Sequence, residues 1–339
     1  MQQTISPPFW HPACSGAFIL DWDGVLADTR LDFGPLRQKY FEGKIVPLIE
    51  AADRLPESVR DEVKAEIRRI EMEGAEKAVP VKGARDLIAW LNDSGKPWAV
   101  VSRNCRDSIL LAAERCGITL PPVLLSREDP HVKPAPEALA LAAKKMKVRL
   151  ADCVMTGDFI YDILGARRAA IRAVLVQRGE TEWSHLADAA WPTVEEFAHA
   201  LAHPSPLVPW EYHDLTRKYG TEHLKAAARN IYRLSGADGV CLQVRTLARL
   251  GAFRFSIPEE AKLGLSDWKD STFPAQAIDM PLSPLLEDLM AAHWPCVQFV
   301  PPETQDREPS HRVQEVPPSL QGAELENFFI DSLKWTAKT

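Results

Sequence analysis

Short apolar runs alternate with amphipathic stretches over the first 200 residues of the chain. The runs are rich in β-forming residues, and most are followed by polar, glycine or proline residues; they cover residues 16–20, 98–102, 123–126, 153–156 and 173–176. The stretches between them repeat apolar residues at helical spacing and cover residues 84–92, 106–116, 135–146 and 161–170. Strands that alternate with helices of this length are typical of a parallel sheet covered on both faces. The pattern therefore predicts an α/β fold with a Rossmann-like parallel sheet sandwiched by helices.

One segment interrupts the alternation directly after the first predicted strand. Residues 31–79 contain no strand pattern, only two helical stretches separated near residues 55–56. The second stretch carries closely spaced charges of both signs, which is typical of a solvated helix face. We therefore expect a small helical cap over residues 30–79, inserted into a core of residues 1–29 and 80–203.

Closely spaced prolines after residue 203 cannot continue a helix or a central strand, so we expect a linker over residues 204–209. Beyond it, helical patterns cover residues 210–234, 282–292 and 323–335, strand patterns cover residues 239–245, 252–257 and 297–300, and a polar, proline-rich stretch expected to be an exposed loop covers residues 301–318. This order predicts a second, smaller α/β module over residues 210–339. By elimination we assign it a regulatory role, self-association or the binding of a protein partner.

The composition is that of a folded protein and narrows the class of function. The chain has 339 residues, of which 46% are hydrophobic and 26% charged, which excludes wholesale disorder. No apolar run approaches the roughly 20 residues of a membrane-spanning helix, so no membrane association is expected. The net charge of −7 argues against a general nucleic-acid binder. No two of the six cysteines share a CxxC spacing, so a reducing cytoplasm is the expected location.

Polar side chains follow four of the predicted strands, at the point where each strand ends. They are Asp21 and Asp23 after the first strand, Ser102, Arg103 and Asn104 after the second, Lys133 after the third, and Asp158 and Asp162 after the fourth. Reactive groups of such sheets gather outside the carboxyl ends of the strands, so we expect these side chains to meet at one edge. Two carboxylates separated by one residue are costly to hold close together without a cation. The pattern therefore predicts a metal-assisted site.

Taken together, these motifs resemble those of the haloacid dehalogenase superfamily of hydrolases. The style is that of the phosphoglycolate-phosphatase-like members, which carry a helical cap after the first motif, and the resemblance covers residues 16–201. The second motif departs from the usual pattern, because Arg103 stands between the hydroxyl residue Ser102 and Asn104.

The resemblance implies a magnesium-dependent phosphatase that acts through an aspartyl-phosphate. Asp21 would attack phosphorus, and Asp23 would protonate the leaving oxygen and later deprotonate the attacking water. Mg²⁺ would be bound by the carboxylates of Asp21 and Asp158 and by the backbone carbonyl of Asp23. Asp162 would bind the metal or hold a metal-bound water.

The second and third motifs would bind the phosphoryl oxygens. Lys133 and the hydroxyl of Ser102 take this role by resemblance, with Arg103 and Asn104 as further candidates. The neighbouring charges at Arg127, Glu128 and Asp129 are interpreted as loop charges.

The expected substrate is a small organic phosphate, such as phosphoglycolate, a sugar phosphate or a nucleotide. The short cap of about 50 residues would close the site incompletely and admit water, which favours hydrolysis. Two alternatives stay open. A phosphomutase of the same family would use the same residues, and a binding or scaffold protein could carry a vestigial hydrolase core.

Overall fold

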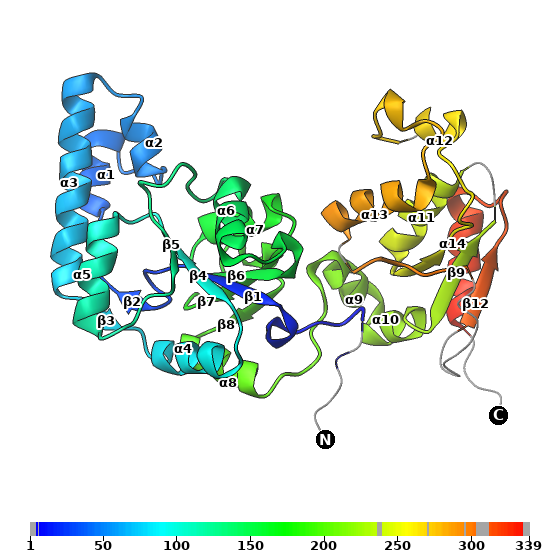
Figure 1. Ribbon diagram of the computed structural model, residues 1–339, viewed down its shortest axis with the longest axis horizontal. Helices are drawn as coiled ribbons and strands as arrows, with labels where there is room; N and C mark the ends of the chain where they lie inside the picture. Colours follow the sequence, from blue (N-terminus) through cyan, green and yellow to red (C-terminus); the bar gives the residue numbers. More distant parts are fainter. Residues whose placement is uncertain are drawn as a thin grey trace. The chain divides into compact units, whose positions relative to one another are not determined.

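The chain forms two compact units (Figure 1). The computed structural model describes residues 5, 7–235, 239–269, 271–294, 296–302 and 312–334. The first unit is Pro12–Ser205, and the second is Pro206–Thr339 together with Met1–His11. The boundary lies inside the segment expected as a linker. Trp10 forms an antiparallel bridge with Leu207, which ties the described N-terminal residues to the second unit, whereas the sequence pattern placed them in the core.

A six-stranded parallel sheet forms the centre of the first unit, in the order β5-β4-β1-β6-β7-β8. Its strands are β1 (Ala17–Leu20), β4 (Trp98–Val101), β5 (Val123–Leu125), β6 (Cys153–Gly157), β7 (Arg172–Val176) and β8 (Ala189–Trp191). Five of them match the predicted strands, and β8 was not predicted. Every residue of β1, β4 and β6 is buried, because the sheet is covered on both faces. The predicted α/β fold with a parallel sheet is confirmed.

Helices cover both faces of this sheet. They are α4 (Ala84–Asp93), α5 (Arg106–Cys116), α6 (Pro136–Met146), α7 (Ile160–Arg168) and α8 (Val194–Ala202). Ile19 of β1 packs in one hydrophobic cluster with Leu139 of α6 and Ile163 of α7. The adjacent Phe18 points to the opposite face, where its ring meets that of Trp90 of α4 at 5.6 Å between centroids.

The predicted cap is an insertion held by a two-stranded antiparallel hairpin. Strand β2 (Ala27–Asp28) pairs with β3 (Val79–Pro80), and between them lie α1 (Gly34–Phe41), α2 (Leu48–Ala52) and α3 (Glu57–Glu76). The prediction of two helices and no strand was wrong in detail: the two-residue strands are too short to give a pattern, and Pro47 starts a separate short helix. Leu36, Val63 and Ile67 belong to a small hydrophobic core of the cap itself.

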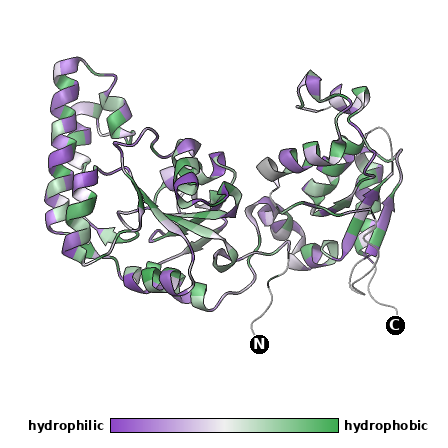
Figure 2. Cartoon of the chain, in the orientation of Figure 1, coloured by the Kyte–Doolittle hydropathy of each residue, from purple (hydrophilic) through white to green (hydrophobic). Residues whose placement is uncertain are grey.

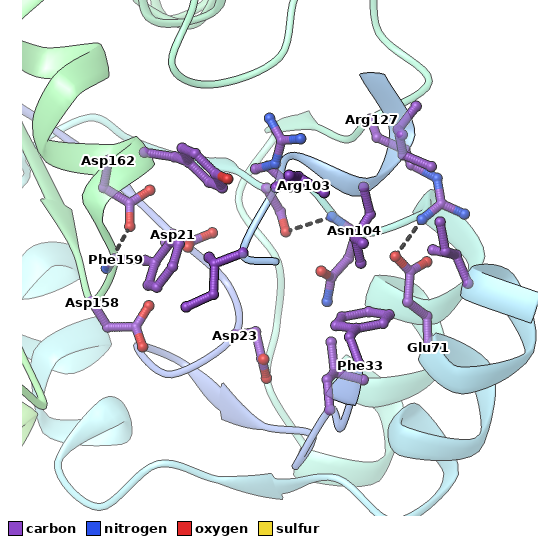
Figure 3. Close-up of a pocket in the computed structure, with 18 of the residues that line it drawn as sticks. Asp21, Asp23, Phe33, Glu71, Arg103, Asn104, Arg127, Asp158, Phe159 and Asp162 are labelled. Atoms are coloured by element: carbon purple, nitrogen blue, oxygen red, sulfur yellow. Dashed lines mark hydrogen bonds and ion pairs between the residues drawn. The ribbon is translucent and has the colours of Figure 1, made fainter. Parts of the chain in front are cut away.

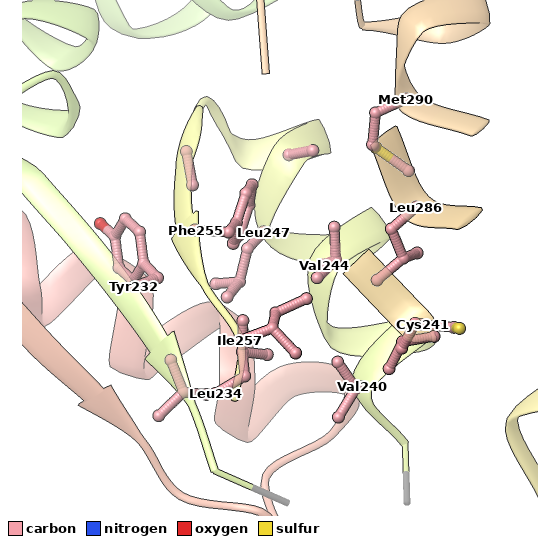
Figure 4. Close-up of a cluster of buried hydrophobic side chains, with 14 of the residues drawn as sticks. Tyr232, Leu234, Val240, Cys241, Val244, Leu247, Phe255, Ile257, Leu286 and Met290 are labelled. Atoms are coloured by element: carbon pink, nitrogen blue, oxygen red, sulfur yellow. The ribbon is translucent and has the colours of Figure 1, made fainter. Parts of the chain in front are cut away.

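The second unit contains a four-stranded parallel sheet in the order β11-β10-β9-β12. Its strands are β9 (Asn230–Leu234), β10 (Arg254–Ser256), β11 (Gln298–Phe299) and β12 (Arg312–Val316); its α-helices are α9 (His213–Tyr219), α10 (Thr221–Ala227), α11 (Val240–Leu250), α12 (Leu265–Lys269), α13 (Leu282–His293) and α14 (Gly322–Leu333). Figure 4 shows its core, where Tyr232 and Phe255 of the sheet lie near Leu247 of α11 and Leu286 of α13. The expected second α/β module is confirmed.

Three expectations for this unit were wrong. Residues 230–234 form a strand where a helix was predicted, residues 240–250 form a helix where a strand was predicted, and β12 occupies part of the expected exposed loop. The last residue of the helix predicted over residues 323–335, Trp335, lies outside the described residues. Hydrophobic residues concentrate on the central strands of the first unit (Figure 2). Among the described residues, no helix combines the length and apolar character needed to cross a membrane.

Candidate active site

The four predicted strand ends meet at one edge of the first sheet, because β5, β4, β1 and β6 are neighbours in it. They border a cavity of about 340 Å³ that lies between this edge and the cap. Figure 3 shows Asp21, Asp23, Asp158 and Asp162 on one side of this cavity. The order of the strands therefore brings these side chains to the same edge of the sheet, as expected.

Three carboxylates and one lysine form the centre of the site. Asp21, Asp158 and Asp162 each place an oxygen within 4.8 Å of the others. The ammonium of Lys133, 1% exposed, lies 2.8 Å from Asp21 Oδ1 and 2.6 Å from Asp162 Oδ1. The N–H of Phe159 donates to Asp162 Oδ2 at 3.0 Å, so Asp162 also caps the start of α7.

The electrostatics of this cluster favour a cation. Burial and the charges of Asp21 and Asp162 together raise the pKa of Asp158 to about 8, while Arg178 opposes them. Burial and Asp21 likewise raise the pKa of Asp162 to about 6, against the opposing charge of Lys133. Burial alone would lower the pKa of Lys133, but the two carboxylates outweigh it and the pKa is raised. A divalent cation would relieve the remaining repulsion between the carboxylates.

Two glycines make room for these carboxylates. Gly24 has a left-handed backbone (φ +77°), and a Cβ there would lie 2.5 Å from Asp158 Oδ2. A Cβ on Gly157 would lie 2.2 Å from the carboxyl group of Asp162. The all-oxygen donor set and the space kept open around it fit Mg²⁺.

Asp23 lines the cavity, but its carboxyl lies outside the three-carboxylate cluster. Its Oδ1 accepts hydrogen bonds from the backbone N–H of Thr29 at 3.0 Å and from the Thr29 hydroxyl. Burial raises the pKa of Asp23 to about 6, although the Thr29 hydrogen bonds oppose the shift. A carboxyl with such a pKa can donate and accept a proton near neutral pH.

The three residues of the second motif all line the cavity, and one of them, Arg103, also contacts the cap. Ser102 is buried, its hydroxyl accepts from the backbone N–H of Asn104 at 3.1 Å, and both residues line the cavity. Arg103 also lines the cavity, but its guanidinium is engaged. It forms an ion pair with Glu50 of α2 at 2.7 Å, donates to the carbonyl of Lys133, and lies 4.7 Å from the centre of the Tyr161 ring.

The charged residues of the site that the sequence analysis missed include Arg127 and Arg178. Arg127, interpreted there as a loop charge, lines the cavity and pairs with Glu71 of α3, which is 3% exposed (Figure 3). The signal was present, because Glu71 follows the buried Val63 and Ile67 at four-residue intervals on the apolar face of α3.

The second is Arg178, which donates to the backbone carbonyl of Asp158 at 2.9 Å and to its Oδ2 at 3.1 Å. Arg178 follows the end of β7, so the strand-end rule that found the other residues would have found it as well.

Comparisons with known proteins cover this first unit. A family model described as a haloacid dehalogenase-like hydrolase matches residues 16–170. The chain is 25% identical over 175 residues to pyrophosphatase PpaX of Halalkalibacterium halodurans, covering 47% of this chain and 81% of that protein. It is 24% identical over 167 residues to an uncharacterized hydrolase of Saccharomyces cerevisiae, covering 48% of this chain and 77% of that protein. A solved hydrolase from Pseudomonas syringae shares 17% identity with a TM-score of 0.48, covering 56% of this chain and 99% of that chain.

The family match spans the strand ends that carry Asp21, Ser102, Lys133 and Asp158, and it ends before the second unit begins. The first unit of this chain is therefore a haloacid dehalogenase-like hydrolase domain.

Proposed function

We propose that this domain is a Mg²⁺-dependent phosphatase that hydrolyses a phosphomonoester through an aspartyl-phosphate on Asp21. The observation that carries the proposal is the convergence of Asp21, Asp158 and Asp162 around the buried ammonium of Lys133. Phosphoryl transfer requires a fixed nucleophile and positive charge around the transferred oxygens. Asp21 would be the nucleophile, and Lys133 together with a Mg²⁺ held by the carboxylates would supply the positive charge.

Asp21 is held in one orientation for attack. Its Oδ1 accepts from the N–H of Trp22 at 2.7 Å and lies 2.8 Å from the ammonium of Lys133. In the first step a bond forms between an Asp21 oxygen and phosphorus while the bond from phosphorus to the leaving oxygen breaks. The carboxyl of Asp23 gives its proton to that oxygen.

In the second step Asp23, now ionised, takes a proton from water as the water oxygen attacks phosphorus. Phosphate leaves, and the Asp21 carboxylate and the protonated Asp23 are restored. Mg²⁺ bound by the carboxylates of Asp21 and Asp158 and the backbone carbonyl of Asp23 would supply the charge that lets an anionic nucleophile approach an anionic phosphoryl group. The hydroxyl of Ser102 and the amide of Asn104 line the cavity where the phosphoryl oxygens would lie.

The test is phosphate release from a panel of phosphomonoesters and pyrophosphate, with and without Mg²⁺. Wild type should release phosphate only with Mg²⁺, and Asp21→Asn should lose roughly 10³-fold or more of the activity, because the nucleophile is gone. Asp152→Asn is the matched control, since Asp152 lies in the same unit, pairs with Arg149 and is 39% exposed. It should keep wild-type activity.

Other outcomes would contradict the proposal in distinct ways. Equal release by wild type and Asp21→Asn would exclude the aspartyl-phosphate. Isomerisation of a sugar phosphate that requires a bisphosphate activator would identify a phosphomutase. No reaction with any compound, by protein that Mg²⁺ still stabilises, would favour a binding or scaffold role.

A further inference from the structure

The cavity has two sides of different chemistry. The sheet edge supplies four aspartates, whereas the cap supplies a wall of apolar side chains that includes Phe33, Val46, Ile49 and Ile67. A phosphoryl group placed at the sheet edge would therefore direct the rest of the substrate toward this wall. Contacts with this cap wall would then distinguish one phosphomonoester from another.

Four arginines line the cavity, and three of them are already engaged by carboxylates. Arg103 pairs with Glu50, Arg127 with Glu71, and Arg178 with Asp158. The fourth, Arg37 of α1, differs from the others. Within the described part of the chain, no carboxylate lies at ion-pair distance from its guanidinium.

The guanidinium of Arg37 is positioned by the cap. The guanidinium carbon of Arg37 lies 5.7 Å from the centre of the Phe33 ring. The Nε of Arg37 is buried and has no hydrogen-bond partner among the described residues. Arg37 lines the same cavity as Tyr161 and the four aspartates of the sheet edge. A buried donor without an acceptor is unfavourable, and a guanidinium binds carboxylate or phosphate with two parallel hydrogen bonds.

We propose that Arg37 binds a second anionic group of the substrate, at the end remote from the phosphoryl group. The substrate class is then a phosphomonoester whose carbon chain lies along the apolar cap wall and ends in a carboxylate or a second phosphate. This inference rests on the proposed phosphatase function for the placement of the phosphoryl group. It makes Arg37 a specificity-determining residue that takes no part in the chemical steps.

A series of substrates of increasing length tests this assignment. The series contains ω-phosphoryloxy carboxylic acids of two to six carbons, the primary amide of each acid, and the matching α,ω-bisphosphates. Acid and amide have nearly the same shape and differ in charge. At the best length, wild type should show a kcat/KM about tenfold or more higher for the acid, or for the bisphosphate, than for the amide. Whichever of the two charged series, acid or bisphosphate, shows the larger preference over the amide identifies the anionic group that Arg37 binds.

Arg37→Gln should remove this preference. We expect KM for the charged substrate to rise about tenfold with little change in kcat, and the amide to react as with wild type. Arg60→Gln is the matched control, because Arg60 lies on α3 of the same cap, pairs with Glu57 and Asp61, and does not line the cavity. It should keep the wild-type preference.

Binding to the Asp21→Asn variant separates the two proposals. Calorimetric titration of this variant with acid and amide, with and without Arg37→Gln, reports the preference even where no turnover occurs. Equal binding and equal kcat/KM of acid, bisphosphate and amide at every length would overturn the role of Arg37 while Asp21-dependent phosphate release stands. A preference in binding that Arg37→Gln removes, without hydrolysis of any compound, would support Arg37 and overturn the phosphatase.

Discussion

Asp21 and Asp23 lie two positions apart on one loop, yet their carboxyl groups have different surroundings. Asp21 is fixed by a backbone N–H and the ammonium of Lys133, whereas Asp23 is buried against Thr29 and has a pKa raised to about 6. In the first step the nucleophile must be ionised while the general acid is protonated. Different surroundings allow one of two neighbouring carboxyls to be ionised while the other keeps its proton. The Asp-x-Asp spacing alone does not create this difference; the Lys133 ammonium beside Asp21 and the burial of Asp23 do.

Replacement of Asp158 tests the repulsion inside the acidic cluster. In metal-free protein the folded-state pKa of Asp158 is about 8, above the ordinary value of 3.8. The folded state then holds a proton that the unfolded state releases, so this group costs stability as pH rises from about 4 to about 8. Asp158→Asn removes that loss. With EDTA present, we expect the free energy of unfolding of the variant to exceed that of wild type by on the order of 2 kcal/mol at pH 8. This difference should disappear near pH 4.

Urea unfolding across this pH range, with and without Mg²⁺, measures the effect. Mg²⁺ should stabilise wild type and leave Asp158→Asn nearly unchanged, because a ligand is lost. An unchanged pH profile in EDTA, or equal stabilisation of both proteins by Mg²⁺, would contradict the assignment of Asp158 to the metal site.

Residues at strand ends could be predicted because their position depends on local sequence. Asp21, Ser102, Lys133 and Asp158 each come within a few residues of an apolar run or a proline turn. The pair of Glu71 with Arg127 joins positions 56 apart in the sequence, and it depends on how the cap folds over the sheet edge. No local sequence pattern predicts such a pair, although the position of Glu71 on the apolar face of α3 indicates that this glutamate has a buried partner.

Two cap helices contact the core through ion pairs of different character. The Glu50–Arg103 pair from α2 is partly exposed, with Glu50 46% exposed. The Glu71–Arg127 pair from α3 is buried, and Glu71 also accepts from the N–H of Cys105 at 3.1 Å. Exposed pairs contribute little to stability, whereas breaking a buried pair leaves an uncompensated charge.

We therefore expect Glu71→Gln to destabilise the closed cap by about 3 kcal/mol and Glu50→Gln by about 0.5 kcal/mol. Amide hydrogen exchange in α1, α2 and α3 measures cap opening, and it should accelerate strongly only in Glu71→Gln. Glu62→Gln, at an exposed cap position that pairs with Lys39, serves as the control. Equal acceleration in the Glu50 and Glu71 variants would show that burial does not set the strength of these contacts.

At the level of elements, the first unit was predictable and part of the second was not. The strands of the first unit are short, continuous apolar runs, which are typical of buried parallel strands. In the second unit, Val240, Val244, Leu247 and Ala248 recur at helical spacing between Gly239 and Gly251. The β-branched residues at the start of this helix suggested a strand, but the three- and four-residue spacing and the flanking glycines specify the helix.

The whole chain contains two units with separate hydrophobic cores. The candidate metal ligands among the described residues lie in Pro12–Ser205, so metal binding should act on this unit. We expect two thermal transitions in scanning calorimetry, with Mg²⁺ raising the temperature of one and leaving the other unchanged. Asp158→Asn should remove the shift, which identifies the transition of the first unit. A single transition that moves as a whole would show that the units unfold together.

The short β2–β3 hairpin makes the cap exchangeable. Ala27 pairs with Pro80 and Asp28 with Val79, so the chain leaves and re-enters the core across a single strand spacing of about 5 Å. Because the core already closes this gap, an insertion of another length adds little loop-closure cost. A chimera that replaces residues 30–78 would keep Thr29, Lys133 and Asp158 in place while it substitutes the whole apolar wall. Recombination at these two peptide segments can therefore change which compound is accepted and leave the reacting groups intact.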